Sequence, residues 1–523
     1  MHLSRTGHID TFTRDHLPPT EQWPELLPLD YPERLNCGVE LLDCAPVPDA
    51  PCLRTEEEVW TYRGLLSRAN RIANVLVNDY GLIPGNRVLL RAPNNPTLVA
   101  CWFAVLKAGG VAVTTMPLLR DQELDAVDGI AKVSLSLVDD RFPCALPSAV
   151  MFSQLMAAAE TKSDTFANVN TAADDVALLA FTSGTTGRPK ATMHFHRDVL
   201  AIADTFSTQI LRPNAGDVFA GSPPLGFTFG LGGLVVFPMR VGASALLLEK
   251  GTPEVLLPAL EKHGATIVLT APTAYRAMVA NLPADGLPKL RLCVSAGEPL
   301  PKSTWEAWYA ATGLKLIDGI GATELLHIFI SAAGDDIRPG ATGLPVPGYS
   351  ATVLDENGAV AGPGVSGRLA VKGPTGCRYL ADDRQLTYVR DGWNLTGDTY
   401  LMDEDGYFWY QSRSDDMIIS AGFNIAPPEV EWALLKHAEV KECAVVGLPD
   451  EERTTVVAAY VVLAEGVIGD AAKVDELREH CRQEIAPYKL PRVITFVPAL
   501  PRTSTGKIQR FALRGVDCSN THI

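Results

Sequence analysis

The sequence lacks the features that mark several large classes of protein. None of its ten cysteines forms a C-x-x-C pair, and they are distributed from Cys37 to Cys518, which argues against a zinc site and against a disulfide framework. The first residues contain no apolar signal core, and no uncharged apolar run reaches the length that spans a membrane. We therefore expect reduced, mostly buried thiols and a cytoplasmic protein without a membrane partner.

The chain also lacks an excess of basic residues. Lys and Arg number 45 against 61 Asp and Glu, so the net charge at pH 7 is −16, and nucleic acid is not an expected partner. A polyanionic nucleotide is still compatible with a locally basic site. The 523 residues, of which 47% are hydrophobic, exceed what one ordinary core holds, so we expect at least two domains.

Predicted helices and strands alternate from about residue 57 onward. Residues 97–107 carry apolar side chains at helical spacing, and they lie between two short apolar runs, 87–92 and 111–116, that predict strands. The same alternation recurs between residues 243 and 296. It indicates parallel sheets covered by helices, that is, an α/β fold.

The composition changes after about residue 340. Glycine and proline separate short predicted strands there, such as 349–354 and 367–372, which indicates a small β-rich subdomain. A compact α+β pattern follows, with helices predicted at 428–436 and 475–484 and strands at 442–446 and 455–462. We predict a large N-terminal domain of residues 1–413, built of parallel-sheet βα layers plus the β-rich subdomain, and a small α+β C-terminal domain of residues 414–523.

The stretch FTSGTTGRPK at 181–190 carries the clearest chemistry. Small hydroxyl and glycine residues follow a short apolar run, and such a loop brings backbone N–H groups and hydroxyls close to an anion; these residues are Thr182, Ser183, Gly184, Thr185 and Thr186. Lys190 adds a cation at the rim. The spacing differs from that of the nucleotide-hydrolase loop, and a flexible polar turn is the alternative interpretation.

Two further stretches carry polar residues after predicted strands. CVSAGEPL at 293–300 predicts a strand that ends in Ser295-Ala296-Gly297-Glu298. Glycine followed by a polar residue at the end of a strand suits a nucleotide edge meeting bare backbone. DGIGATELLHIF at 318–329 places the hydroxyl of Thr323 beside the carboxylate of Glu324. Mg²⁺ prefers carboxylate and phosphate oxygens, so Glu324 is a candidate metal ligand and Thr323 a candidate phosphate contact. A helix N-terminus with an acidic first turn would give the same pattern.

These stretches resemble, in order, the motifs of the adenylate-forming superfamily. FTSGTTGRPK is similar to its phosphate-binding motif and DGIGATELLHIF to its adenine-and-metal motif. The resemblance implies an enzyme that uses ATP and Mg²⁺ to activate a carboxylate as an acyl-adenylate and then passes the acyl group to a thiol. Many members carry an aromatic residue at the position of Ile320, and DGIGATELLHIF as a whole is most similar to benzoate– and 2-aminobenzoate–CoA ligases.

The resemblance also implies roles for residues outside the phosphate loop. Asp318, Gly319 and Ile320 would contact the adenine, and Thr323 and Glu324 would act in catalysis, with Glu324 as the metal ligand. In GWNLTGD, Asp398 would bind the ribose, because a carboxylate suits a diol, together with Arg413. Asp415 would be the hinge of a mobile C-terminal domain, Gly422 would line the pantetheine tunnel, and Lys507 in PRTSTGKIQR would be the adenylation lysine.

The stretch SPPLGFTFGLGG at 222–233 lies where members of the superfamily place a wall of the acid pocket. Phe227 and Phe229 would stack on an aromatic acid, and Gly230 would leave room for a flat ring. Both phenylalanines are equally compatible with an ordinary core. His327 would orient the substrate carboxylate or meet an ortho substituent, unless it is a hydrogen-bonded structural histidine.

We therefore predict an ATP-dependent aryl-CoA ligase that activates 2-aminobenzoate or a related benzoate. The alternatives are a ligase that prefers benzoate or salicylate, and a stand-alone adenylating enzyme that loads a carrier protein. Because the chain runs only from Lys507 to Ile523 after the last motif, free CoA is the expected acceptor. The expected partners are the aromatic acid, ATP and CoA, and the oligomeric state stays open, a homodimer included.

Overall fold

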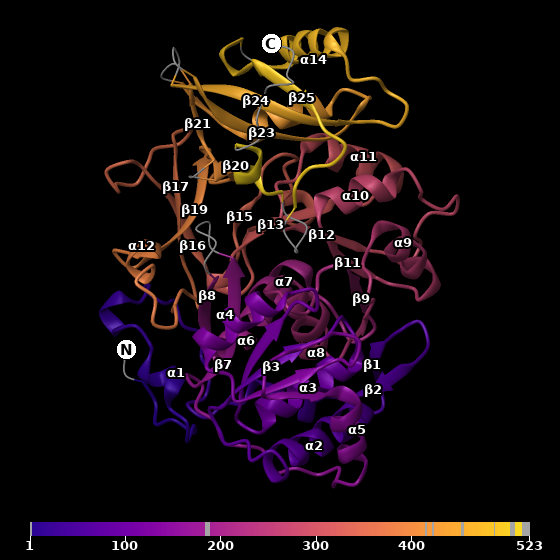
Figure 1. Cartoon of the computed structure of the whole chain (residues 1–523), viewed down its shortest axis with the longest axis vertical. Coiled ribbons are helices and arrows are strands. Elements are labelled where there is room, and N and C mark those ends of the chain that lie inside the picture. The colour runs from indigo at the N-terminus through magenta and orange to yellow at the C-terminus, as the bar shows by residue number, and fades with distance from the viewer. Residues whose placement is uncertain are drawn as a thin grey trace. The chain divides into compact units, whose positions relative to one another are not determined.

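The computed structural model describes residues 3–183, 189–413, 416–420, 423–450, 454–485, 487–502 and 508–514 (Figure 1). Backbone contacts divide the chain into two compact units. The first comprises Met1–Leu300, Thr304–Ala351 and Ala370–Leu395, and the second comprises Pro301–Ser303, Thr352–Leu369 and Thr396–Ile523. The domain boundary after residue 413 remains a prediction.

The first unit contains a six-stranded sheet. Its order is β6 (Ala149–Met151), β5 (Leu135–Val138), β3 (Arg87–Arg91), β4 (Val111–Thr115), β7 (Val176–Ser183) and β8 (Pro189–Phe195). All neighbouring strands are parallel except β7 and β8, which are antiparallel. The helices of this part are α2 (Tyr62–Asn78), α3 (Pro96–Lys107), α4 (Asp121–Ala131), α5 (Phe152–Glu160) and α6 (His196–Ile202).

Helix α3 shows why the sequence folds in this way locally. Asn95 caps the helix by accepting a hydrogen bond from the N–H of Leu98, and Pro96 occupies the first turn, where its missing N–H costs nothing. The helix is apolar on all sides and is buried throughout, which explains why its sequence reads as a nearly continuous hydrophobic run.

The second sheet of this unit has nine strands. Its order is β15 (Leu344–Pro345), β14 (Ile328–Ser331), β13 (Leu316–Gly321), β12 (Leu292–Ala296), β11 (Ile267–Thr270), β9 (Val218–Gly221), β10 (Ser244–Leu246), β1 (Pro51–Arg54) and β2 (Val59–Thr61). The strands from β1 to β13 pair in parallel. From β13 onward the chain turns back on itself, because β14 is antiparallel to β13 and β15 is antiparallel to β14.

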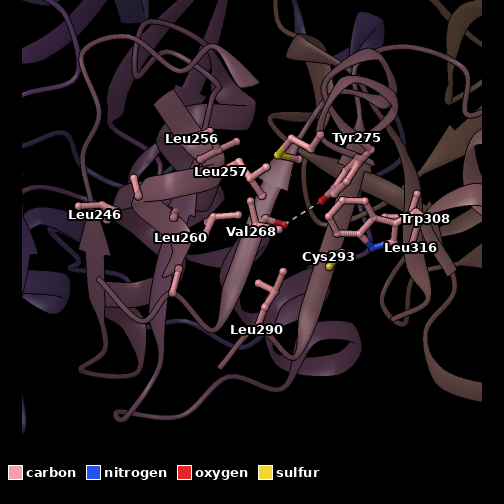
Figure 2. Packing of buried hydrophobic residues seen from close by; sticks show 14 of the residues in the cluster. Leu246, Leu256, Leu257, Leu260, Val268, Tyr275, Leu290, Cys293, Trp308 and Leu316 are labelled. Atoms are coloured by element: carbon pink, nitrogen blue, oxygen red, sulfur yellow. Dashed lines mark hydrogen bonds between the residues drawn. The ribbon is translucent and has the colours of Figure 1, made fainter. Parts of the chain in front are cut away.

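Three helices cover one face of the nine-stranded sheet (Figure 2). They are α9 (Pro253–Lys262), α10 (Pro272–Val279) and α11 (Lys302–Thr312). The Tyr275 ring packs edge-on against Trp308 at 4.9 Å between centroids. Its hydroxyl donates a hydrogen bond of 2.9 Å to the carbonyl of Val294, so a buried polar atom is satisfied inside an apolar layer.

The part of the chain after residue 340 is rich in short strands, as predicted. One five-stranded sheet contains β16 (Ser350–Leu354), β17 (Ser366–Lys372), β18 (Val389–Arg390), β19 (Trp393–Met402) and β20 (Phe408–Arg413). In the second unit, β23 (Val440–Asp450), β24 (Thr454–Leu463) and β25 (Val493–Phe496) form a further sheet. Helices α13 (Pro427–Leu435) and α14 (Ala471–Glu484) pack on it through residues such as Leu434 and Leu477.

The predicted fold class is confirmed: the chain is α/β, with a large N-terminal part of sheets covered by helices and a small α+β part at the C-terminus. No helix among the described residues is both long and apolar enough to cross a membrane. The nine cysteines within the described ranges are free thiols, most of them buried, in agreement with the sequence.

Candidate functional site

The predicted phosphate loop connects the antiparallel strands β7 and β8. Thr182 lies opposite Lys190 and Ser183 lies opposite Pro189 across this pair. Strand β7 runs parallel to β4, so the connection leaves the sheet at the carboxyl edge of the parallel strands, where ligands bind in open α/β sheets. Three predicted loop residues, Gly184, Thr185 and Thr186, lie outside the described ranges. The side chain of Ser183 is also not described.

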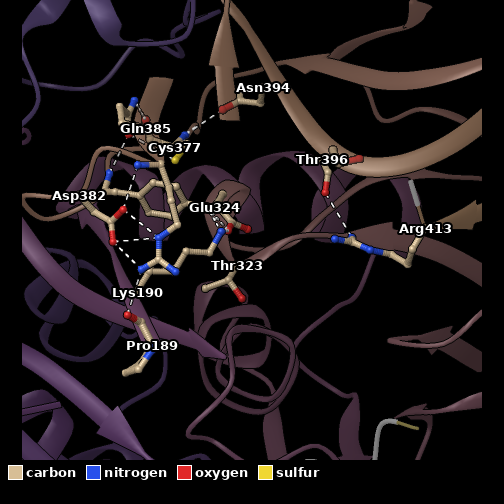
Figure 3. Close-up of polar contacts among 12 residues, drawn as sticks. Pro189, Lys190, Thr323, Glu324, Cys377, Asp382, Gln385, Asn394, Thr396 and Arg413 are labelled. Atoms are coloured by element: carbon tan, nitrogen blue, oxygen red, sulfur yellow. Dashed lines mark hydrogen bonds and ion pairs between the residues drawn. The ribbon is translucent and has the colours of Figure 1, made fainter. Parts of the chain in front are cut away.

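Lys190 forms a three-membered polar cluster with Glu324 and Tyr379. Figure 3 shows the ion pair of Lys190 with Glu324. The Lys190 Nζ lies 2.9 Å from the Glu324 Oε1 and also donates to the Tyr379 hydroxyl. The Tyr379 hydroxyl in turn donates to the same Glu324 Oε1. Burial alone would raise the pKa of Glu324, but the Lys190 charge and the Tyr379 hydroxyl outweigh burial and lower it. Glu324 is therefore a buried, ionised carboxylate.

The turn that carries Thr323 and Glu324 is held from two sides. It is a single 3₁₀ turn, Thr323–Leu325, that follows β13. The His194 Nε2 donates to the Thr323 carbonyl at 2.8 Å, and the Thr375 hydroxyl donates to the Leu325 carbonyl at 2.8 Å. Burial lowers the pKa of His194 to about 4, so this histidine is neutral at pH 7. The predicted strand end with a hydroxyl and a carboxylate is confirmed.

The chain after the turn is strained. Leu326 has φ 69° and ψ −33°, a region that side-chain-bearing residues rarely adopt. This conformation directs the chain into β14, with His327 between the turn and the strand. Such strain commonly accompanies functional sites, and here it separates a charged side of the turn from an aromatic one.

His327 belongs to an aromatic cluster that also contains Phe206, Phe229 and Phe237. The His327 ring centroid lies 5.5 Å from that of Phe206, 5.6 Å from that of Phe229 and 4.6 Å from that of Phe237. His327 is 3% exposed, and burial lowers its pKa to about 3, so its ring is neutral. Within the described residues neither ring nitrogen meets a partner at strict hydrogen-bond geometry. An interaction with the Phe229 backbone raises the His327 pKa and so opposes the effect of burial.

Glycines make room for this cluster. A Cβ on Gly232 would lie 2.4 Å from the His327 Cδ2, and a Cβ on Gly230 would lie 2.1 Å from the Pro224 carbonyl oxygen. The segment predicted to form a wall of the acid pocket contains a short turn of helix. Phe229 lies in α7 (Thr228–Leu231) and contacts His327, whereas Phe227 precedes that helix. Both phenylalanines are half-buried.

Asp318 is the second unusual carboxyl group of this region. It lies in β13, beside Ser295 of β12. Its Oδ1 is inaccessible to solvent and lacks a hydrogen-bond partner in the part of the chain that the structure describes. Burial raises the pKa of Asp318 to about 8. Gly319 and Ile320 continue the same strand, and Gly297, with φ 88°, follows the end of β12 and leads into Glu298.

In the second unit, Asp398 and Arg413 lie directly opposite each other on β19 and β20. The Arg413 Nη1 lies 3.0 Å from the Asp398 Oδ1. It also donates to the Thr396 carbonyl at 3.2 Å (Figure 3). Gly397 has φ 78°, and a Cβ there would lie 2.9 Å from the Arg413 Nη2. The two residues predicted to bind the ribose are therefore brought together in one pair.

Three other predicted site residues, Asp415, Gly422 and Lys507, lie outside the described ranges. The sequence analysis in turn missed Tyr379 and His194. Lys190 and His194 are four residues apart on β8, so they lie on the same face of the strand. That spacing was the available signal for His194. No comparable local signal existed for Tyr379, which is 189 residues from Lys190 along the chain.

A second group of potential metal ligands occurs in the C-terminal part. His437, Glu439 and Glu476 lie close enough together to share an ion. However, the Lys473 ammonium pairs with both glutamates, so a cation already neutralises this group. Glu324, the ionised carboxylate of the first unit, suits a hard cation such as Mg²⁺ better.

Comparisons with known proteins agree with these features. The sequence model of the family described as AMP-binding enzyme matches residues 43–379, and that of the AMP-binding enzyme C-terminal domain matches residues 429–507. The benzoate–CoA ligase of Thauera aromatica is 37% identical over 478 residues, which cover 87% of this chain and 90% of that protein.

Two solved structures are also similar. The anthranilate CoA ligase AuaEII, in complex with anthranoyl-AMP, has a TM-score of 0.88 at 34% identity and covers 93% of this chain and 98% of its own. A benzoate CoA ligase from Burkholderia xenovorans LB400 has a TM-score of 0.84 at 30% identity and covers 92% of this chain and 100% of its own.

These similarities confirm the predicted superfamily and the predicted enzyme class. They also confirm ATP and coenzyme A as cosubstrates at the level of the family. With a family match that spans more than half of its length, the chain belongs to the AMP-binding enzyme family, whose reaction here is that of an AMP-forming acid–CoA ligase.

Proposed function

We propose that this enzyme activates 2-aminobenzoate as its acyl-adenylate and transfers the acyl group to CoA. An aromatic acid as substrate is supported by the aromatic cluster and by relatives named as benzoate–, 3-hydroxybenzoate– and anthranilate–CoA ligases. The products are 2-aminobenzoyl-CoA, AMP and pyrophosphate.

The observation that supports an amino group on the ring of the acid is the buried, neutral imidazole of His327. A buried neutral imidazole offers one donor and one acceptor, and within the described residues neither meets a partner at hydrogen-bond geometry. The amino group of 2-aminobenzoate can pair with the acceptor nitrogen. Benzoate would leave the acceptor nitrogen unpaired, at a cost of about 1–3 kcal/mol, so the enzyme favours the substituted acid.

In the first step the carboxylate of the acid attacks the α-phosphorus of ATP, and pyrophosphate leaves. Glu324 would hold Mg²⁺, because ionised carboxylate oxygen atoms are suitable ligands for a hard cation. When bound, this metal supplies charge neutralisation at the phosphates. Lys190 and the loop from Thr182 would bind the phosphates, Thr323 would contact them through its hydroxyl, and Lys507 would offset the charge that develops on the attacking carboxylate and the α-phosphate.

The nucleoside contacts follow from the pairs described above. The buried Oδ1 of Asp318 is an acceptor that the amino group of adenine can satisfy, while Gly297 leaves backbone exposed for the ring edge. In the second unit, Asp398 would bind the ribose hydroxyls, and Arg413, its ion-pair partner, would fix the carboxylate in place.

In the second step the CoA thiol attacks the acyl carbon, and AMP leaves. By resemblance, the C-terminal domain turns about Asp415, which removes Lys507 and brings the loop at Gly422 to the pantetheine. Cytoplasmic location remains a prediction, and the oligomeric state stays open.

A product assay tests the proposal. Purified enzyme is incubated with ATP, Mg²⁺ and CoA and with 2-aminobenzoate, benzoate, salicylate or a medium-chain fatty acid, and mass spectrometry follows the nucleotides and thioesters. The expected result is AMP with 2-aminobenzoyl-CoA as the fastest-formed thioester. Faster benzoyl- or salicyl-CoA formation would replace the proposed acid, and AMP without a thioester would indicate a carrier-protein acceptor.

A further inference from the structure

We propose that Tyr379 is a positioning residue for the metal ligand: its hydroxyl keeps Glu324 oriented when Lys190 moves from Glu324 to the phosphates of ATP. The inference rests on the proposed function, because it concerns the site at which ATP and Mg²⁺ would bind. Tyr379 lies outside every motif that the sequence analysis assigned to the reaction.

The polar cluster concentrates its contacts on one atom. Both Lys190 and Tyr379 contact the Oε1 of Glu324, and Lys190 also donates to the Tyr379 hydroxyl. A buried carboxylate requires a cation, and Lys190 is that cation. If Glu324 holds Mg²⁺, the metal would supply the neutralising charge, and Lys190 could then turn to the phosphates.

Tyr379 is expected to stay in place when Lys190 moves, because its own backbone contacts hold it. Its N–H donates to the Gln385 side chain at 2.9 Å, and its backbone bridges to Thr192 of β8. The next residue, Leu380, donates to the Ala191 carbonyl at 2.9 Å. The Tyr379 side chain is 1% exposed and packs edge-on against Tyr388 at 5.8 Å between centroids.

The hydroxyl is also suited to the task chemically. It is a neutral donor, so it holds the carboxylate without competing for the charge that the metal needs. A tyrosine hydroxyl ordinarily has a pKa of about 10, so it keeps its proton throughout the physiological range. Residues that orient metal ligands in this way typically change metal affinity by about 10–100-fold when they are removed.

The test is the Tyr379→Phe variant, which removes the hydroxyl and keeps the ring that lies 4.3 Å from the Lys190 Nζ. Tyr388→Phe is the matched control, because it removes a hydroxyl from the adjacent ring. Binding of Mn²⁺ to the enzyme in the presence of a non-hydrolysable ATP analogue is titrated by electron paramagnetic resonance. The expected result is a Kd for Mn²⁺ that rises about 10–100-fold in Tyr379→Phe and is unchanged in Tyr388→Phe.

Two kinetic measurements separate positioning from a general loss of structure. In Tyr379→Phe, the Mg²⁺ concentration for half-maximal adenylation rises, whereas the rate of thioester formation from supplied acyl-adenylate is unchanged. Wild-type affinity for Mn²⁺ in Tyr379→Phe would overturn the proposal. The titration contains no aromatic acid, so its outcome is independent of whether 2-aminobenzoate is the substrate.

Discussion

The two sides of the turn Thr323–Leu325 treat their buried polar groups in opposite ways. On one side, the Glu324 carboxylate is paired with the Lys190 ammonium and bonded to Tyr379. On the other, the His327 imidazole lies among three phenylalanine rings and meets no partner at hydrogen-bond geometry in the described residues. A buried charge requires a counter-ion, whereas a neutral ring does not.

This difference corresponds to two tasks. The charged side would serve the part of the reaction that every acid shares, that is, ATP and its phosphates. The aromatic side would decide which acid enters. Substitutions on the charged side are therefore expected to lower the rate for all acids alike, and substitutions in the aromatic cluster to change the preference among acids.

The largest effect is expected from Lys507→Ala, which removes a cation proposed to act in adenylation only. Loss of one group that stabilises charge in a transition state costs about 10²–10³-fold. Pyrophosphate release should fall by this factor with both 2-aminobenzoate and benzoate, while thioester formation from supplied acyl-adenylate is retained. Equal loss of both half-reactions would contradict the role of Lys507.

Glu324→Gln removes the negative charge that pairs with Lys190. It leaves the Lys190 ammonium without its counter-ion, and an uncompensated buried charge costs about 3–5 kcal/mol. We expect a lower thermal unfolding temperature and strongly reduced adenylation. The double variant with Lys190→Met should recover part of the thermal stability and none of the activity. If the single variant unfolds at the wild-type temperature, the ion pair contributes nothing to thermal stability.

Asp318→Asn tests how the other buried carboxyl group makes the stability of the protein depend on pH. The pKa of Asp318 rises from 3.8 to about 8 on folding, so the folded protein binds this proton more tightly than the unfolded chain does. Stability from this group is therefore present below pH 4 and is lost as the pH rises to about 8. The unfolding temperature of the variant should exceed that of the wild type by a margin that grows from pH 5 to pH 8. A margin independent of pH would show that Asp318 does not titrate in this range.

The smallest effect on stability is expected from His327→Leu. The substitution removes a polar ring without a hydrogen-bond partner at proper geometry and keeps an apolar side chain of similar size, so the free energy of unfolding should stay within about 1 kcal/mol of the wild-type value or increase. Chemical denaturation measures it. A loss of several kcal/mol would mean that His327 is a structural histidine.

The sequence predicted much of this arrangement. The helix predicted at residues 97–107 is α3, which begins one residue earlier. The strands predicted at 87–92 and 111–116 are β3 and β4, each one residue shorter. Helical spacing and apolar runs are local properties, so one sequence suffices to read them. The turn of Thr323 and Glu324 was likewise found from its own residues.

The contacts that define the site were not accessible in the same way. Tyr379 meets Lys190 and Glu324 only because strand β8 and the chain at 378–380 lie side by side, and nothing local in the sequence indicates that pairing. The helical conformation of Phe229 was also missed, because glycines on both sides weaken any helix signal. The pairing of Asp398 with Arg413 depends on the register of β19 and β20.

The most direct test compares kcat/KM for 2-aminobenzoate and for benzoate in the wild type, Glu324→Gln and His327→Leu. We expect Glu324→Gln to lower both values and keep their ratio. His327→Leu should lower the ratio by about 5–150-fold, which corresponds to about 1–3 kcal/mol. Because the His327 pKa is about 3, the wild-type ratio should be constant between pH 6 and pH 9. An unchanged ratio in His327→Leu would contradict the division of tasks and the proposed substrate.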